Sequence, residues 1–157
     1  MPVFVSLQAT ITLIDISSVQ FQASIWNQIV ITQAVTDIVN QIPACNYKCI
    51  SNSSVSIISL VRRRNLLASV LPVTIQIQDN IPELGSTTIA FDSISSIINA
   101  SIWSGQFSSA LNIIATQHTL STLQYTKVMK AFTATNTYLP PTSNPTLVPS
   151  GIPTGNY

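Results

Sequence analysis

Charged side chains are the scarcest feature of this chain. Only 7% of its 157 residues are charged, whereas an ordinary soluble domain carries about 25%. The net charge of +1 excludes the basic surface by which proteins bind nucleic acid or an anionic membrane. Ser, Thr, Asn and Gln dominate the remaining polar surface, and a surface near zero net charge favours association. The composition favours an extracellular protein that associates with its own copies; a monomeric secreted domain is the alternative.

Groups that catalyse reactions or bind metals are also few. A catalytic triad needs a base beside a nucleophile and a third group that orients the base, and no segment assembles one. We therefore expect no enzyme activity and no cofactor, with His118 structural or exposed to solvent. Asp79 and Glu83 form a weak candidate pair for Ca²⁺, because they lack the Asp/Asn/Gly spacing of a calcium loop. The acids are scattered along the chain at Asp15, Asp37, Asp79, Glu83 and Asp92.

Long apolar runs are absent as well. No stretch reaches the roughly 18–20 uninterrupted apolar residues of a membrane span, so we expect none. The first seven residues have neither a basic region nor a long apolar region, and they do not resemble a signal peptide. If the protein is secreted, its signal is not part of this sequence.

The two cysteines lie four positions apart, at Cys45 and Cys49. Two thiols and one distant histidine are too few for a tetrahedral zinc site, and the spacing differs from the redox motif Cys-x-x-Cys. We expect a disulfide that closes this short loop, which implies an oxidising compartment and an extracellular or cell-surface location. Two unpaired thiols are the alternative.

The hydrophobic periodicity predicts alternating strands and helices. The order is β-α-β-β-α-β, which is the ferredoxin-like split β-α-β arrangement: an α+β fold with an antiparallel sheet and two helices on one face. In the first strand, Ala9, Ile11 and Leu13 share one face; in the first helix, the apolar face includes Ile25, Ile29, Ile31, Val35, Ile38 and Val39. The predicted elements are strands at 7–16, 54–61, 70–78 and 119–133 and helices at 25–39, from 87 through 98, and 107–114.

Two terminal segments flank this domain, which we place at residues 8–133. Residues 1–7 are β-prone and form an N-terminal arm. Residues 134–157 are rich in Pro, Thr and Ser, cannot form a core of their own, and favour extended geometry. Since the tail also carries apolar residues, we expect it to lie against its own domain or a neighbour. The candidate assembly residues in the two segments are Val3, Phe4, Val5, Leu7, Tyr138, Leu139, Leu147, Val148 and Ile152.

Half of the basic charge lies in three consecutive residues, Arg62, Arg63 and Arg64. They fall between the second and third predicted strands, at the tip of a hairpin. A charged tip discourages edge pairing of two β-prone strands. Cleavage by a processing protease and binding of anionic glycans are alternative interpretations.

Sugar attachment would add polar surface to this charge-poor chain. Two N-glycosylation motifs are present, Asn52-Ser53-Ser54 and Asn99-Ala100-Ser101, each of which requires an exposed asparagine. The threonines of the tail are candidates for O-glycosylation, namely Thr135, Thr137, Thr142 and Thr146. We therefore expect covalent glycans.

The segment Arg-Arg-Arg-Asn-Leu-Leu-Ala-Ser between two β-prone runs, together with Ser104-Gly105-Gln106-Phe107 at a helix end, resembles the SEA-like, ferredoxin-like modules of secreted cell-surface proteins in algae and oomycetes. The resemblance covers residues 8 to about 120. It implies an extracellular structural or adhesive role and no enzyme activity. This chain departs from the pattern by inserting Asn65 before the two leucines and by its cysteine loop. It also lacks the Gly-Ser cleavage site of SEA domains.

These features together predict a structural subunit of an extracellular filament or surface assembly. An unpaired edge strand accepts a strand from another copy, and a head-to-tail contact that does not close into a ring gives an open polymer. Either terminal segment is a candidate for the donated piece. The alternative is a monomeric adhesion or glycan-binding module of a larger surface protein.

Overall fold

The structure is a computed structural model that describes residues 2–46, 48–60, 70–124 and 126–138. The Arg62, Arg63 and Arg64 triplet lies outside the described residues. So do Leu139, Leu147, Val148 and Ile152 of the tail and the candidate glycosylation sites Thr142 and Thr146.

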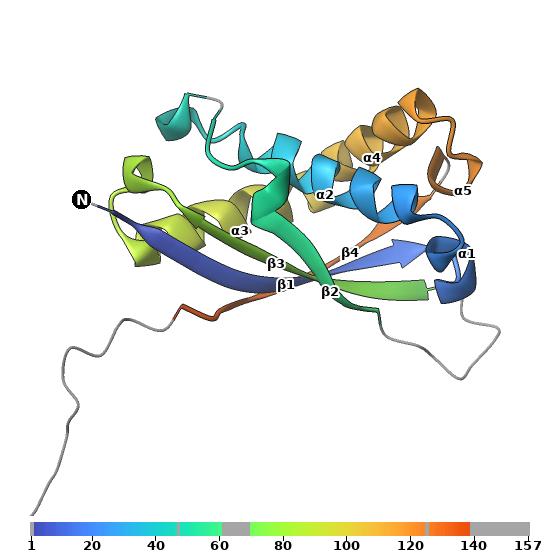
Figure 1. The fold of residues 1–157 in the computed structure, drawn as a ribbon, viewed down its shortest axis with the longest axis horizontal. Helices are drawn as coiled ribbons and strands as arrows, with labels where there is room; N and C mark the ends of the chain where they lie inside the picture. The colour runs from blue at the N-terminus through green and yellow to red at the C-terminus, as the bar shows by residue number, and fades with distance from the viewer. Residues whose placement is uncertain (1, 47, 61–69, 125, 139–157) are drawn as a thin grey trace, which may run out of the picture.

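The protein is a mixed α and β domain in which helices and an antiparallel sheet form two layers (Figure 1). The strands are β1 (Phe4–Ile14), β2 (Val55–Leu60), β3 (Val70–Asn80) and β4 (Lys127–Asn136). The α-helices are α1 (Ser18–Gln22), α2 (Ile25–Val39), α3 (Thr87–Ser104), α4 (Gln106–Gln117) and α5 (Ser121–Gln124), and short 3₁₀ turns lie at η1 (Pro43–Cys45), η2 (Asn52–Ser54) and η3 (Pro82–Leu84).

The sheet has the strand order β2-β3-β1-β4, and each neighbouring pair is antiparallel. β1 and β3 pair over their full lengths, from Phe4 opposite Asn80 to Ile14 opposite Val70. The long helices cover one face of the sheet, and Figure 1 shows the other face without a helix over it. β2 and β4 therefore form the two edges.

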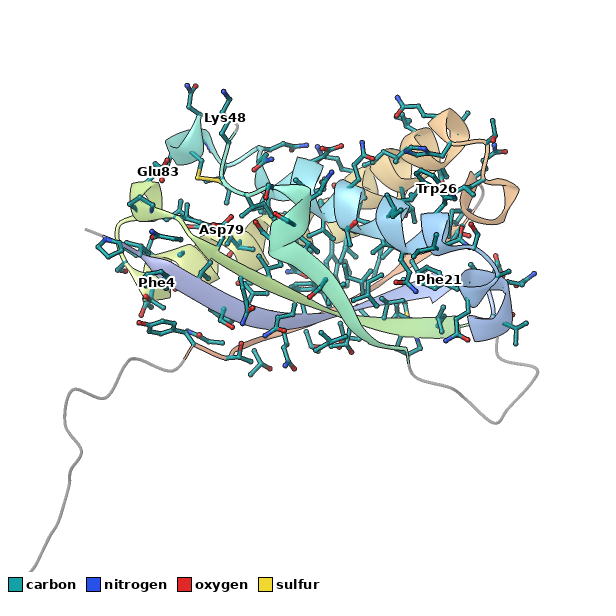
Figure 2. All side chains as sticks on the ribbon, viewed as in Figure 1. Phe4, Phe21, Trp26, Lys48, Asp79 and Glu83 are labelled. Carbon is teal, nitrogen blue, oxygen red and sulfur yellow. A yellow bond between two sulfur atoms is a disulfide. The ribbon has the colours of Figure 1, made fainter. Side chains whose placement is uncertain are left out.

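Alternation of side chains explains the core. Val5, Leu7, Ala9, Ile11 and Leu13 of β1 point toward the helices and are buried, whereas the residues between them face the opposite side. Figure 2 shows Phe21 between the helical layer and the sheet, where it is fully buried.

The bounds of α2 agree with those predicted from the sequence. Ser24 caps the helix, with its hydroxyl accepting a hydrogen bond from the Trp26 amide. The helix face predicted as apolar is only partly buried. Ile31, Val35, Ile38 and Val39 are in the core, but Ile25 and Ile29 are exposed. Burial of the first turn of this helix was therefore a wrong expectation.

The expected N-terminal arm also needs correction. Residues 4–7 belong to β1, one of the two central strands; all four pair with β3, and Leu7 also pairs with Asn136 of β4. Val3, Val5 and Leu7 are buried in the domain's own core, and only Phe4 is exposed among the four expected arm residues. These side chains bury more apolar surface within their own sheet than a free arm would, so this segment is not available for donation to a neighbour.

The last strand differs from its expected position. It was predicted at 119–133, whereas α5 occupies part of that range and β4 runs from Lys127 to Asn136. The domain therefore extends past residue 133, and Thr137 continues the pairing by donating its amide to the Ser6 carbonyl oxygen at 2.8 Å. Only the part of the tail beyond Tyr138 remains a candidate for an extended arm.

Candidate functional site

The two edges of the sheet differ in charge. Among the described residues, β2 pairs only with β3 and β4 pairs only with β1. β4 carries the exposed side chains of Lys127 and Lys130, and lysine on an edge discourages pairing with another chain. The six residues of β2 are uncharged. β2 is therefore the edge that more readily accepts another strand.

A groove of about 300 Å³ lies beside this edge, between β2 and α2. Residues 25, 28, 29 and 32 of the helix follow the spacing i, i+3, i+4, i+7 and so lie on one helical face. None of the described residues that line the groove carries a charge. It is lined by Ile25, Gln28, Ile29, Thr32, Val55, Ser56 and Ile57.

Apolar side chains are unusually exposed around this groove. Ile25 is 68% exposed and Ile58 of β2 is 43% exposed. The pairing of β2 with β3 shifts between Ile57 and Ser59, which is the position of Ile58. A bulge of this kind locally interrupts the ladder, and the Val55 N–H already donates to the Asn52 carbonyl oxygen. Regular pairing on this edge is therefore best available at Ser56 and Ile57.

Two side-chain contacts hold the α2 wall of the groove in place. At the first turn of α2, the Asn27 side-chain amide donates to the carbonyl oxygens of Gln20 and Phe21 at 3.3 and 3.0 Å, and the Trp26 ring stacks on His118 with centroids 5.2 Å apart. Figure 2 places Trp26 within the helical layer. His118 is thus a structural contact between α2 and the end of α4.

The start of β2 is held by the loop that precedes it. Cys45 and Cys49 form a disulfide with a Cα–Cα distance of 4.9 Å, which confirms the pairing predicted from the sequence. The Ser54 hydroxyl donates to a carboxylate oxygen of Asp79 at 2.6 Å. These contacts attach the segment before β2 to β3, so the groove is built on fixed elements.

A second hollow, of about 420 Å³, lies on the uncovered side of the sheet at one end of β1 and β3. Its aromatic lining residues are Phe4, which is 50% exposed, and Tyr138. Amide and hydroxyl groups lie between them: the Gln78 amide donates to the Ser6 hydroxyl at 3.3 Å, and Ser6 also shares a 2.8 Å hydrogen bond with the Thr137 hydroxyl. Tyr138, the last residue that the structure describes, thus lies at this hollow.

The candidate glycosylation residues have different surroundings. Asn52 in η2 and Asn99 in α3 are both exposed, as the motif requires. Thr135 is exposed on β4, whereas the Thr137 hydroxyl is engaged by Ser6.

The acidic residues do not converge. The Asp79 carboxylate accepts from Ser54 and from the Asn80 amide, at 2.6 and 2.7 Å, while Glu83 lies in the separate turn η3. No cluster of three potential metal ligands is found within the described ranges. Burial raises the pKa of the Asp37 carboxyl above its ordinary value. A search of the helices in the described part of the chain finds none long and apolar enough to cross a membrane.

The α2 side of the groove escaped prediction from the sequence. Isoleucines at helical spacing indicate a buried face, and Ile25 and Ile29 carry the same signal as the core residues after them. One feature distinguishes them: Gln28 and Thr32 lie on the same helical face, so that face mixes apolar with uncharged polar side chains. Such a mixture is typical of the border of a helix's buried apolar stripe, where side chains are only partly covered.

Comparison of the chain with models of protein families, with curated proteins and with solved structures finds no match.

Proposed function

We propose that this chain is a structural subunit of an extracellular filament or surface assembly, whose copies associate through the free edge of β2. The observation that carries the proposal is the uncharged edge of β2, which no other described strand covers, beside an apolar groove. An added strand gains main-chain hydrogen bonds from such an edge and side-chain contacts from the groove. The disulfide supports an oxidising, extracellular setting.

The fold that we infer is the ferredoxin-like split β-α-β arrangement, as in the SEA-like modules that the sequence resembles. Its support is the strand order β2-β3-β1-β4 with antiparallel neighbours, α2 between β1 and β2, and α3 and α4 between β3 and β4. This arrangement places the N-terminal strand in the centre of the sheet and leaves β2 and β4 at its edges. The tail therefore leaves from the edge opposite the groove.

The tail and the groove lie at opposite edges of the sheet, and this placement favours an open polymer. The tail follows β4, while the groove adjoins β2 at the other edge of the sheet. A contact between one copy's tail side and the next copy's groove side is heterologous, and such contacts form filaments when the rotation does not close a ring. Two copies pairing symmetrically through β2 would instead give a dimer.

A charge in the groove tests the proposal. Ile25→Lys places an ammonium group at a position that is 68% exposed, so the fold tolerates it. Ile113→Lys is the matched control, because Ile113 is 59% exposed on α4 and lies outside the groove. We expect Ile25→Lys to reduce self-association at least tenfold in sedimentation velocity, while Ile113→Lys associates like the unmodified chain. Equal behaviour of the two variants would refute the role of the groove.

The alternative is a monomeric adhesion or glycan-binding module. The hollow between Phe4 and Tyr138 supports it, because an aromatic side chain beside amide and hydroxyl groups suits a sugar ring. A chain that stays a monodisperse monomer at high concentration would favour this module over the subunit.

A further inference from the structure

The tail has a repeat that bears on how it could join another copy. Beyond Pro140, which is out of phase with them, the tail prolines Pro141, Pro145, Pro149 and Pro153 recur every fourth residue. In an extended chain, successive residues direct their backbone N–H and C=O groups to alternate sides, so residues an even number apart share one side. In an extended tail, all four prolines would therefore face the same side.

Because of this spacing, the two sides of an extended tail differ in how many backbone N–H groups they offer for pairing. Proline has no backbone N–H and is tolerated in sheets where its nitrogen faces away from the partner strand. Within residues 141–157, the side opposite these four prolines keeps an N–H at each position, which includes Thr146, Val148, Ser150 and Ile152. An extended tail can thus pair along one side only.

The groove beside β2 suits such a strand. It offers the edge of Ser56 and Ile57, which no other described strand covers, and the apolar side chains of Ile25 and Ile29. On the tail, Val148 and Ile152 lie four residues apart, so in an extended chain their side chains share one face. Neither the described lining of the groove nor the side chains of residues 141–157 include a charged group that would have to be buried unpaired.

We infer that residues 141–157 of one copy pair as a one-sided strand with the β2 edge of the next copy. The inference rests on the proposed function and identifies the segment that occupies the groove. The tail 139–157 spans up to about 60 Å at roughly 3.1 Å per residue, which is enough to leave its own domain and reach a neighbour. Because the proline side cannot extend the sheet, each groove takes one tail, and the polymer is a row of folded domains instead of a cross-β fibre.

Two composition-preserving exchanges test the proline phase in the full chain. The variant Pro149→Ser/Ser150→Pro moves one proline to the pairing side. The control Pro145→Leu/Leu147→Pro moves one by two residues and keeps it on the other side. We expect the first to weaken self-association about tenfold, since a pairing N–H is lost and the ring obstructs the edge, and the control to stay within about twofold. Equal effects of the two exchanges would overturn the inference.

Deleting residues 139–157 separates failure of the inference from failure of the proposed function. If the shortened chain still associates and Ile25→Lys still prevents it, the groove is used and the tail is not its occupant. If the full chain is monomeric at all concentrations, the proposed function fails. A fluorescein-labelled peptide of residues 141–157 tests the tail–groove pairing independently of self-association. Binding of the peptide to the full chain that is lost in Ile25→Lys supports the pairing, and lack of binding overturns it.

Discussion

Asn40, at the end of α2, makes two hydrogen bonds with the backbone of Ile50. Its side-chain amide nitrogen donates to the Ile50 carbonyl oxygen at 3.0 Å, and its amide oxygen accepts from the Ile50 N–H at 2.8 Å. The pair closes the connection between α2 and β2 and encloses the Cys45–Cys49 disulfide. One side chain thus ties the end of α2 to the segment that leads into β2.

Replacing this side chain should loosen the connection. We expect Asn40→Ala to lower the free energy of unfolding by about 1–3 kcal/mol, because two hydrogen bonds are lost and the partly buried Ile50 groups need new partners. Denaturant titration measures the change. Asn99→Ala is the control, since Asn99 is exposed on α3 and alanine favours helix there; it should be neutral or slightly stabilising. A neutral Asn40→Ala would show that the two bonds do not hold the connection.

The disulfide should contribute less than one that closes a long loop. Cys45 and Cys49 are separated by four positions, and loop-closure entropy for so short a loop is about 2 kcal/mol. We therefore expect Cys45→Ala/Cys49→Ala to remain folded with stability reduced by about that amount, as followed by circular dichroism in denaturant. Complete unfolding would mean that the disulfide is essential to this fold.

The N-terminal residues should be needed for folding. Val5 is 2% exposed and Leu7 is fully buried, and each such side chain stabilises the fold by about 1.5–3 kcal/mol. Deleting residues 1–7 also removes four positions of β1. We expect this deletion to unfold the domain, whereas deleting residues 1–2 leaves the far-ultraviolet dichroism unchanged. A folded domain without residues 1–7 would restore the idea of a donated N-terminal arm.

Sequence patterns identified the helices and the hairpin strands, and missed features that depend on partners in space. The apolar positions from Ile25 to Val39 gave the bounds of α2, because helical periodicity is a local signal. β4 was misplaced because its Thr, Ala and Lys residues alternate poorly, and only pairing with β1 fixes its ends. The groove was missed because an exposed isoleucine and a buried one look alike in sequence.

A carboxyl group on α2 should make stability depend on pH. Burial raises the pKa of Asp37 above its ordinary 3.8, so the folded state binds more protons than the unfolded state, and stability falls as pH rises from that value through the raised pKa. We expect Asp37→Asn to be slightly more stable than the unmodified chain near neutral pH and equal to it at about pH 3. Asp92→Asn controls for the loss of one negative charge. The opposite sign of the pH effect would contradict the assignment.

Glycan attachment can be checked by mass. Asn52 and Asn99 are both exposed, so secretion from a eukaryotic host should add N-glycans at both. We expect Asn52→Gln and Asn99→Gln each to remove the mass of one glycan, as measured by mass spectrometry of the intact protein. A protein secreted without added mass would contradict the expectation of covalent N-glycans.

Hydrogen exchange at β2 as a function of protein concentration tests the central claim most directly. If copies associate through this edge, the amides within Ser56–Ile57 that face away from β3 gain hydrogen bonds in the assembly and exchange more slowly as concentration rises. Amides of β4, at the other edge, serve as the internal reference. We predict slower exchange at β2 with concentration in the full chain and none in Ile25→Lys. Exchange at β2 that is independent of concentration, in a chain that nonetheless assembles, would contradict the account.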